Sequence, residues 1–424
     1  MERLPLPSKI LRPLGYPRVA DLPEHQQKGL RGFWLDGLFA SLANGFTDPY
    51  YSLYMLSLHA TNAQIGLVNT LNQLAAACLA LPGATIADRT GRYKQMALFA
   101  GVISRLMWIV MLTAPLFRGQ TSVTIVLCAW VAIAGMGALG NAAWTALSAD
   151  LVPPRLRGGY FASRNMVIQF VSLLAIPTAG FLVNILGEPE GYQVNLLFAL
   201  AFGVGSIYFY NQIPEHAAPQ QTDRFGTLQA LRRMTKLPHF MRFTAAHTVL
   251  MLGAMIGSPF INVFMAEERH FSVGVIGLVT TIGGLFTFLS MRAMGRFHDR
   301  FGITATMRFG LGIPLVIALW ALVSKPWHAY VVNAFGGFAW AGYNLGSFNL
   351  LLVTTPDEHR PRYIALYTTI VSIVSAIGPI IGAWSLQSVS FQTVFLISGG
   401  VRCVGLLLFF MLVREPDSSP PDPQ

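Results

Sequence analysis

Charged side chains are scarce in this chain. They make up only 11% of its 424 residues, whereas hydrophobic residues make up 53%; a typical soluble domain has roughly 25% charged residues. The sequence also lacks a Gly-Lys-Ser/Thr phosphate loop and a His-Glu-x-x-His pair. ATP-driven pumping and metalloproteolysis are therefore poor fits, and without a convincing nucleophile–base pair or metal set we do not expect an enzyme.

Cysteine is equally rare. Cys78, Cys128 and Cys403 all fall within apolar stretches, so neither a disulfide framework nor a thiolate metal site is indicated, and we expect no metal and no cofactor. The first 32 residues are basic and dotted with proline. They lack the apolar core and small-residue cleavage site of a signal peptide, and we expect nothing to be removed.

What the chain has in abundance is apolar sequence of membrane-spanning length. A spanning helix needs about 20 predominantly apolar residues. Twelve such stretches are present, at roughly 33–58, 63–86, 95–116, 121–148, 160–186, 192–213, 241–265, 272–293, 304–323, 328–353, 363–386 and 391–413. They are too long for barrel strands and lack strand alternation. The sequence thus predicts an all-α, polytopic membrane protein.

These twelve stretches form two copies of one unit. Ile65-Gly66-Leu67-Val68, followed by Asp88-Arg89-x-Gly91, returns 211 residues later as Ile276-Gly277-Leu278-Val279 followed by Asp299-Arg300-x-Gly302. A repeat of this kind dictates the architecture. It predicts two pseudo-symmetric six-helix bundles, related as parallel repeats about an axis along the membrane normal, and two similar membrane halves suggest a transporter.

The basic residues predict the orientation of the chain. We expect an N-terminal arm (1–32), an N-terminal bundle (33–213), a linker (214–240), a C-terminal bundle (241–413) and a tail (414–424). With twelve spans, arm, linker, tail and even-to-odd loops share one side and carry 24 of the 29 Lys and Arg residues. The positive-inside rule places that side, with both termini, in the cytoplasm of a plasma (inner) membrane. The net charge of +10 then reflects topology and anionic lipid, so nucleic acid need not be invoked.

The loop after the second span carries the most specific motif. Gly83-Ala84-Thr85-Ile86-Ala87-Asp88-Arg89-Thr90-Gly91-Arg92-Tyr93-Lys94 closely resembles the cytoplasmic signature of the major facilitator superfamily, and Gly295 through Gly302 is a degenerate copy where that family's second half would place it. Gly91 would permit a tight reversal, and Arg92 would reach an acidic partner. The resemblance covers the whole chain and implies a twelve-helix transporter fold.

The resemblance also implies a cytoplasmic gate. In that family the loop forms a latch with an acidic residue at the inner end of the fourth span, which matches Asp150 here. A local pair between Asp150 and Arg157 is the competing interpretation. The expected gate residues are Gly83, Asp88, Arg89, Gly91, Arg92, Asp150, Asp299, Arg300 and Gly302.

Charged residues inside spans are costly and are functional hypotheses by default. Asp48 in the first span and Arg105 in the third lie at similar depth and could pair, while Asn44 and Tyr51 share the helix face of Asp48. Two interpretations stay open: Arg105 moves and lets Asp48 load and release a proton, or the two form a permanent structural pair. Asp36 lies nearer the cytoplasmic end, where it snorkels or pairs with the basic rim.

The seventh span, counterpart of the first, carries His247, Ser258 and Asn262 in one polar strip. His247 aligns with Asp36 and can titrate near neutral pH, although a packing histidine is the more common case. Arg402, in the last span, has no evident acidic partner in the sequence.

Spans four and ten are the best candidates for solute contacts. They are rich in small residues and carry Asn141 and Trp144 in one, and Trp340, Tyr343, Asn344 and Asn349 in the other. Such a mixture suits an amphipathic organic molecule, although Trp and Tyr are also common interface anchors. With Asn44, Tyr51, Ser258 and Asn262, these residues form the expected cavity lining.

Proline and glycine mark expected bends. Pro49 and Pro259 fall in spans one and seven, Pro177 and Gly180 in span five, and Gly378, Pro379 and Gly382 in span eleven. Proline removes a backbone hydrogen bond and allows kinking. The string in span eleven resembles the antiporter signature that drug–proton exchangers carry in span five, and span five here lacks the Gly-Pro pair.

We therefore expect a monomeric secondary transporter that moves a small organic solute by alternating access, with protons as the driving ion. The alternative is a transporter-derived receptor or lipid-handling protein without coupled flux. Accumulation of solute against its gradient in reconstituted vesicles favours transport, and binding without flux favours the receptor.

The coupling interpretation of Asp48 generates a first prediction. The variant Asp48→Asn cannot release a proton from this position, so solute flux driven by a pH gradient should be lost. Flux would be measured in vesicles with and without the gradient. Unchanged gradient-driven uptake or efflux removes Asp48 from coupling.

Overall fold

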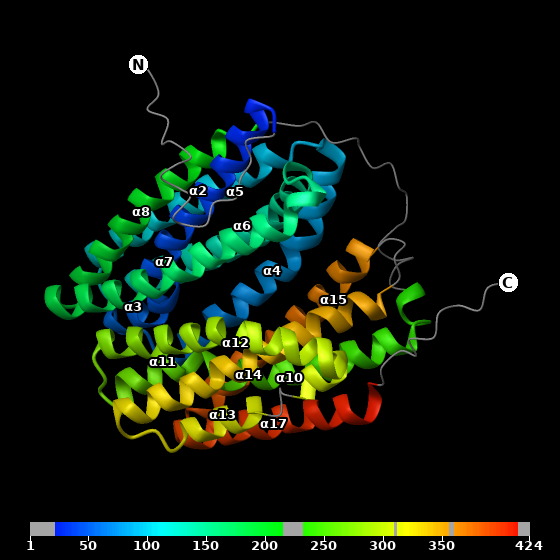
Figure 1. Ribbon diagram of the computed structural model, residues 1–424. Helices are drawn as coiled ribbons and strands as arrows, with labels where there is room; N and C mark the ends of the chain where they lie inside the picture. Colours follow the sequence, from blue (N-terminus) through cyan, green and yellow to red (C-terminus); the bar gives the residue numbers. More distant parts are fainter. Residues whose placement is uncertain (1–21, 215–231, 309–311, 356–359, 414–424) are drawn as a thin grey trace. The chain divides into compact units, whose positions relative to one another are not determined.

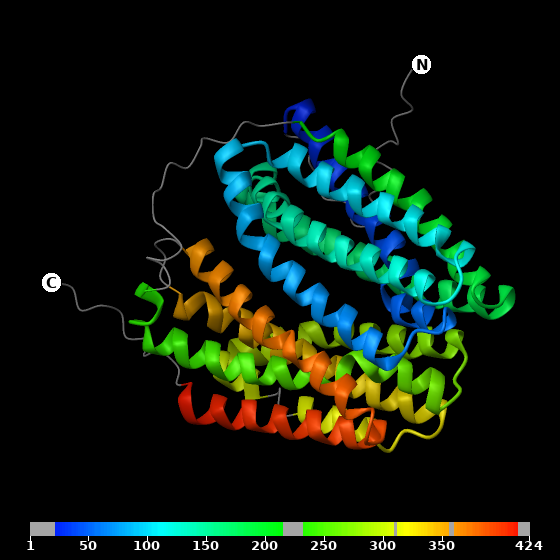
Figure 2. The same cartoon turned by 180° about the vertical axis from the view of Figure 1, so that it is seen from behind.

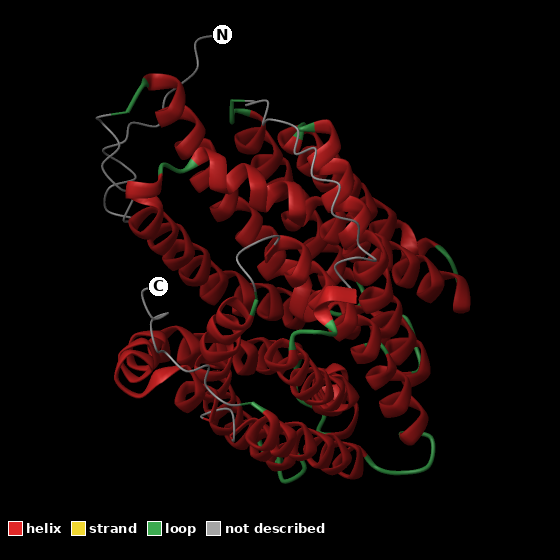
Figure 3. Ribbon diagram, turned by 90° about the vertical axis from the view of Figure 1, so that its right-hand side faces the viewer, coloured by secondary structure: helices red, strands yellow, loops and turns green. Residues whose placement is uncertain are grey.

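The computed structural model describes residues 22–214, 232–308, 312–355 and 360–413. Within some helices only the backbone is described, and Asp88 and Asp150 are among these residues. Throughout the described ranges the regular structure is helical, with no strand (Figure 3). The predicted all-α class is confirmed. Most of the predicted arm, linker and tail lies outside the described residues.

Each of the twelve predicted stretches coincides with a helix or a broken pair of helices (Figure 1). In the first half these are α2 (Glu24–Thr47), α3 (Tyr51–Ser57), α4 (Asn62–Thr90), α5 (Tyr93–Thr113), α6 (Gln120–Leu151), α7 (Arg157–Leu186) and α8 (Glu190–Asn211). In the second half they are α10 (Pro238–Gly257), α11 (Ile261–Val263), α12 (Val273–Arg308), α13 (Gly312–Trp320), α14 (Pro326–Thr354), α15 (Arg360–Ser375), α16 (Ile377–Ser385) and α17 (Phe391–Leu412).

Nine stretches of the described chain are long and apolar enough to cross a membrane by length and composition. The predicted stretches 33–58, 304–323 and 328–353 are not among them. The first contains Asp36 and Asp48, the second is divided by the undescribed residues 309–311, and the third is rich in Asn, Gly and aromatic residues. The charged and polar residues of the first and third stretches lower their mean hydropathy below that of the other spans.

The sequence repeat has a counterpart in backbone geometry. The 3₁₀ segments Asp48–Tyr50 and Ser258–Phe260 interrupt the first and seventh spans at equivalent places, and each has a proline at its second residue. Since proline has no N–H to donate, the α-helical hydrogen bonding cannot continue. Two loop positions repeat as well: Gly91 has φ +62° and Gly302 has φ +80°, a conformation that glycine adopts without strain.

The remaining prolines and glycines lie at close contacts. Pro177 is inside α7, while Gly378 and Pro379 follow the break between α15 and α16. At Gly180 a Cβ atom would lie 2.9 Å from the Tyr50 hydroxyl, and at Gly382 it would collide with the Ile256 carbonyl. These glycines therefore allow a close approach of neighbouring segments.

The chain divides into two compact units. The first contains Met1–Ala60, Cys78–Thr222 and Ser272–Thr281, and the second contains Thr61–Ala77, Asp223–Phe271 and Ile282–Gln424. The start of α4 thus belongs to the second unit, where Thr70 donates to the Ala376 carbonyl at 2.9 Å. The start of α12 belongs to the first, where the Gly274 amide donates to Asn184 at 3.1 Å.

In the first unit α2 packs against α7 and α8, and α5 packs against α6 and α8. Its core is aromatic and aliphatic, and includes Leu30, Phe33, Trp34, Tyr160 and Tyr210. This arrangement encloses the middle of α2, the helix that carries Asp36.

In the second unit α10 lies alongside α17 (Figure 2), and also contacts α15 and α16. Phe240, Phe243, Tyr343 and Phe409 are among the core residues of this unit. The close approach of α10 and α17 requires a glycine. At Gly405 of α17 a Cβ would lie only 2.6 Å from the Leu250 backbone nitrogen of α10. Small residues at such interfaces let helix backbones approach in lipid.

This contact predicts that Gly405→Ala destabilises the protein by about 1–3 kcal/mol, because backbone rather than a flexible side chain must move. Gly400→Ala is the matched control on the same helix, since a Cβ there meets nothing within 4 Å. Thermal unfolding of the purified variants in detergent measures both. Equal midpoints for the two variants would contradict the proposed packing.

Candidate functional site

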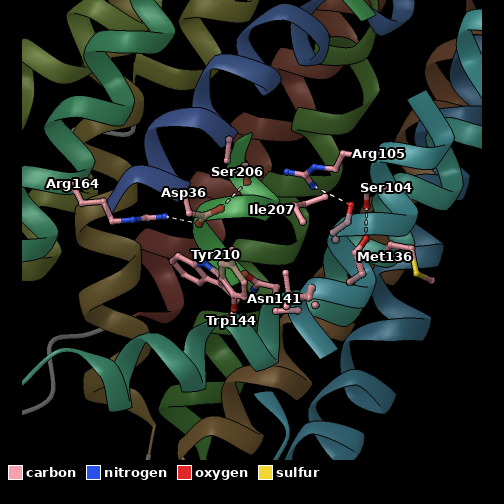
Figure 4. Close-up of a pocket in the computed structure, with 17 residues that line it drawn as sticks. Asp36, Ser104, Arg105, Met136, Asn141, Trp144, Arg164, Ser206, Ile207 and Tyr210 are labelled. Atoms are coloured by element: carbon pink, nitrogen blue, oxygen red, sulfur yellow. Dashed lines mark hydrogen bonds and ion pairs between the residues drawn. The ribbon is translucent and has the colours of Figure 1, made fainter. Parts of the chain in front are cut away.

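The first unit contains a cavity of about 320 Å³ (Figure 4). Its walls come from α2, α5, α6, α7 and α8. The lining residues are Asp36, Ala40, Ala97, Leu98, Ala100, Gly101, Ser104, Arg105, Met136, Gly137, Gly140, Asn141, Trp144, Arg164, Ser206, Ile207 and Tyr210. Three charged side chains therefore face one space within a largely apolar bundle.

Asp36, in the middle of α2, is only 7% exposed. The Ser206 hydroxyl of α8 donates to its Oδ1 at 2.7 Å, and a guanidinium nitrogen of Arg164 lies 3.7 Å from its Oδ2. Burying a carboxylate is costly unless it is paired and hydrogen-bonded. Both conditions hold here, and the aspartate expected near the cytoplasmic rim is enclosed in the helix bundle.

Arg164 is held by the backbone and by two aromatic rings. Its Nε donates to the Phe33 carbonyl at 3.2 Å, and its guanidinium carbon lies 4.4 Å from the Phe33 ring centre and 5.2 Å from that of Trp144. Gly37 makes room for it: a Cβ there would lie 2.7 Å from the guanidinium. Contacts with two neighbouring rings and a backbone carbonyl restrict this planar, always charged group.

Sequence reasoning missed Arg164. It is the fifth residue of the predicted span 160–186 and follows a basic loop. The sequence did contain one signal: Arg164 falls inside a predicted span, and an arginine within the membrane needs a polar or acidic partner. Ser104, Ser206 and Tyr210 were also missed, because a serine or tyrosine in a span carries no signal of its own.

Arg105 faces the same cavity from α5, with Arg164 and Arg105 on opposite sides of Asp36 (Figure 4). One of its terminal nitrogens donates to the Gly101 carbonyl of its own helix at 3.4 Å, and its guanidinium lies 5.3 Å from the Trp108 ring centre. Its buried Nε has no hydrogen-bond partner within the described residues. Among those residues, no ion pair joins Arg105 to Asp48.

Asp48 lies at the break between α2 and α3. It is exposed and accepts a hydrogen bond from the Thr47 hydroxyl at 3.4 Å, and Asn44, one turn earlier, is also exposed. Tyr51 is buried, with its hydroxyl accepting from Trp108 Nε1 at 2.8 Å and its ring 4.9 Å from Trp130. Neither Asp48, Asn44 nor Tyr51 is part of the cavity lining.

The structure thus brings together four of the sequence candidates, Asp36, Arg105, Asn141 and Trp144, in one cavity. In the second unit His247 is 9% exposed, its Nδ1 is 2.6 Å from the Tyr343 hydroxyl, and the two rings stack. Tyr343 is 1% exposed, and Trp340 packs edge-on against it.

The other candidates of the second unit lie apart from this pair. Ser258 accepts a hydrogen bond at 3.0 Å from Arg402, which also donates to the carbonyls of Ala254 and Ile313. Asn262 is partly buried, Asn344 is exposed, and Asn349 is 3.4 Å from a ring nitrogen of His298. Arg402 is therefore held by oxygen atoms of the helices around it.

The expected gate residues are described in part. Gly83 lets α4 approach α6, because a Cβ there would lie 2.7 Å from the Leu139 carbonyl oxygen. Arg89, Arg92, Asp299 and Arg300 are exposed. The side chains of Asp88 and Asp150 lie outside the described residues, so the latch between them stays a prediction.

Comparison with known proteins identifies the family. The protein-family model of the Major Facilitator Superfamily matches this chain twice, over residues 33–258 and 243–424. The chain belongs to the major facilitator superfamily. The predicted membership of this superfamily is thereby confirmed, as is the twelve-helix transporter fold.

Individual relatives are distant. The multidrug resistance protein MdtG of Dickeya zeae is 23% identical over 90% of this chain and 93% of its own length. A Na(+), Li(+), K(+)/H(+) antiporter of Planococcus maritimus is 28% identical, but the match spans only 36% of this chain and 37% of the antiporter. A crystal structure of a variant of the nucleoside transporter NupG superposes with a TM-score of 0.72 at 17% identity, covering 91% of this chain and 100% of that one. At that identity the structural likeness concerns the fold alone.

The ion pair at the cavity predicts a large cost for removing one partner. Arg164→Gln leaves Asp36 buried without its cation and should lower stability by about 3 kcal/mol. Adding Asp36→Asn should recover part of that loss, which a double-mutant cycle by thermal unfolding would measure. Arg155→Gln, an exposed arginine in the turn before α7, is the control. If the stability losses of the two single variants simply add in the double variant, the two side chains do not interact and the ion pair is contradicted.

Proposed function

We propose that this protein is a secondary active transporter that moves a small organic solute by alternating access between its two bundles, driven by protons. Membership of the superfamily supports transport as the general activity. The observation that carries the proposal is Asp36, a carboxylate enclosed by membrane helices yet lining a cavity. Intramembrane carboxylates are rare because they are costly, and they mark ion and proton pathways.

Asp36 is the strongest of the candidate coupling residues. Its partner Arg164 is 3.7 Å away, longer than a tight charge-assisted hydrogen bond. Arg105 exerts a second electrostatic influence on Asp36 and also acts on Asp48. A proton that arrives at Asp36 therefore changes the electrostatic balance among Asp36, Arg164 and Arg105. His247 is the weaker candidate, because its side chain contacts the uncharged Tyr343 hydroxyl and no charged group among the residues that the structure describes.

The cavity lining supports an organic solute. Trp144 and Tyr210 provide aromatic faces, Asn141 and Ser104 provide hydrogen-bonding groups, and Ala and Gly residues of α5 and α6 leave space. Ligand pockets commonly combine a mostly apolar wall with a few polar groups. The near full-length likeness to a multidrug resistance protein favours an organic solute, and the partial likeness to a cation/proton antiporter favours protons.

The distribution of basic residues supports the placement of the protein in the plasma (inner) membrane. The exposed Arg89 and Arg92 lie where α4 ends and α5 begins, and the exposed Arg155 and Arg157 lie where α7 begins. The positive-inside rule then puts both termini in the cytoplasm.

The proposal predicts a specific defect for Asp36→Asn. This variant keeps the size and a hydrogen-bonding group at residue 36 but cannot gain or lose a proton there. In reconstituted vesicles, gradient-driven solute accumulation should disappear while exchange of labelled for unlabelled solute continues. Retained accumulation would exclude Asp36 as the coupling site, and binding of solute without any flux by the unaltered protein would indicate a receptor.

A further inference from the structure

The cavity of the first unit carries an excess of positive charge. Arg105 and Arg164 contribute two guanidinium groups, and Asp36 contributes one carboxylate. The other polar residues of the lining, among them Ser104, Asn141, Ser206 and Tyr210, are uncharged in their ordinary states. With Asp36 ionised, the three charged groups leave one positive charge facing the cavity.

The less engaged of the two arginines is Arg105: the carboxylates of Asp36 and Asp48 act on it only at a distance, and no ion pair joins it to either among the described residues. Both carboxylate oxygens of Asp36 are engaged, one by Ser206 and the other by Arg164. Arg105, by contrast, makes one long hydrogen bond to a carbonyl of its own helix, and its buried Nε has no partner in the described part of the chain. A guanidinium with free donors binds carboxylate-type oxygens in a two-point geometry.

We propose that the cavity binds an organic anion whose acid group is held by Arg105, and that this binding is cooperative with a proton on Asp36. This inference rests on the proposed transport function and names its substrate class. A cationic solute fits less well, because it would have to displace Arg164 from Asp36 and would add a third positive charge to the cavity.

Cooperativity follows from the charges around Asp36. Arg164 of α7, Ser206 and Tyr210 of α8, and Arg105 of α5 act directly on Asp36. Tyr160 of α7 acts on Arg164, and Asp48, at the break after α2, acts on Arg105. A proton on Asp36 removes the negative charge that competes with an incoming anion for both arginines. By linkage, the anion favours protonation by the same factor.

The sign of the pH dependence therefore distinguishes the classes of solute. An anion binds more tightly as the pH falls, because protonated Asp36 no longer repels it. A cation binds more tightly as the pH rises, because it competes with the proton for the same carboxylate. A neutral solute shows little dependence.

The cavity also limits the form of the anion. A volume of about 320 Å³ lies at the small end of the range for ligand pockets. Trp144, Met136, Ile207 and Leu98 provide apolar wall. An acid group attached to one or two rings satisfies both the wall and Arg105.

The test uses the full-length protein purified in detergent and three aromatic carboxylates, 2-naphthoate, cinnamate and 4-phenylbutanoate, each compared with its amine and alcohol analogues. Thermal stabilisation as a function of probe concentration gives the apparent Kd. We expect a carboxylate of this set to bind at least about fivefold more tightly near pH 6 than near pH 8, the lower end of typical coupling factors. The amines should not show this trend.

Two variants assign the effect to residues. Arg105→Gln should abolish carboxylate binding. Asp36→Asn imitates the protonated state and should bind the carboxylate near pH 8 as tightly as the unaltered protein does near pH 6, without pH dependence. Arg155→Gln is the exposed control and should match the unaltered protein.

A third variant covers the possibility that Arg105→Gln does not fold. Gly137 lines the cavity, and a Cβ there meets nothing within 4 Å, so the side chain of a Gly137→Leu variant would begin in open space. It should block carboxylate binding while keeping the unfolding midpoint of the unliganded protein.

The proposal is overturned if none of the carboxylates binds, if the amines bind in their place, or if carboxylate binding survives both Arg105→Gln and Gly137→Leu. Its failure is separable from failure of the proposed function. Solute accumulation without preference for anions would support the transport function and contradict the anion site. pH-dependent anion binding without accumulation would support the anion site and contradict the transport function.

Discussion

The energetic cost of charge inside a bilayer governs the first unit of this protein. Asp36 can remain among membrane helices because Ser206 and Arg164 engage its two oxygens. That pair in turn fixes local packing, since Gly37 must lack a side chain for Arg164 to reach α2. The neighbouring rings of Phe33 and Trp144 then contact the guanidinium. The interaction thus links α2, α6, α7 and α8 around one cavity.

The two repeats share backbone features but differ in chemistry. Both have a proline-containing 3₁₀ break in their first span and a glycine with positive φ after their second. At the position equivalent to Asp36 the second unit has His247, which stacks on Tyr343 and contacts Phe243 and Tyr367. The two repeats therefore share these helix breaks, while charge is concentrated at the cavity of the first unit and aromatic packing at the matching place in the second.

Sequence patterns predicted the fold almost completely and the site only in part. Twelve apolar runs and the repeat were sufficient for the helices, because spanning length is set by the bilayer. The depth of a residue in its span singled out Arg105, and the small-residue composition of span four singled out Asn141. The sequence does not show how each helix is rotated about its own axis. It therefore could not pair Asp36 with Arg164. For the same reason it could not show that Asp48 and Arg105 form no ion pair among the described residues. Such pairings depend on which faces meet, and that is decided by packing between distant segments.

The central claim is that a proton on Asp36 sets the charge of the cavity that receives the solute. Proton uptake on ligand binding tests it most directly, because the linkage is reciprocal. The measurement follows a pH-sensitive dye in weakly buffered detergent solution as an aromatic carboxylate is added to the unaltered protein and to Asp36→Asn. Uptake of protons by the unaltered protein, absent in the variant, is the predicted result. Release of protons, or equal uptake by both proteins, would contradict the account.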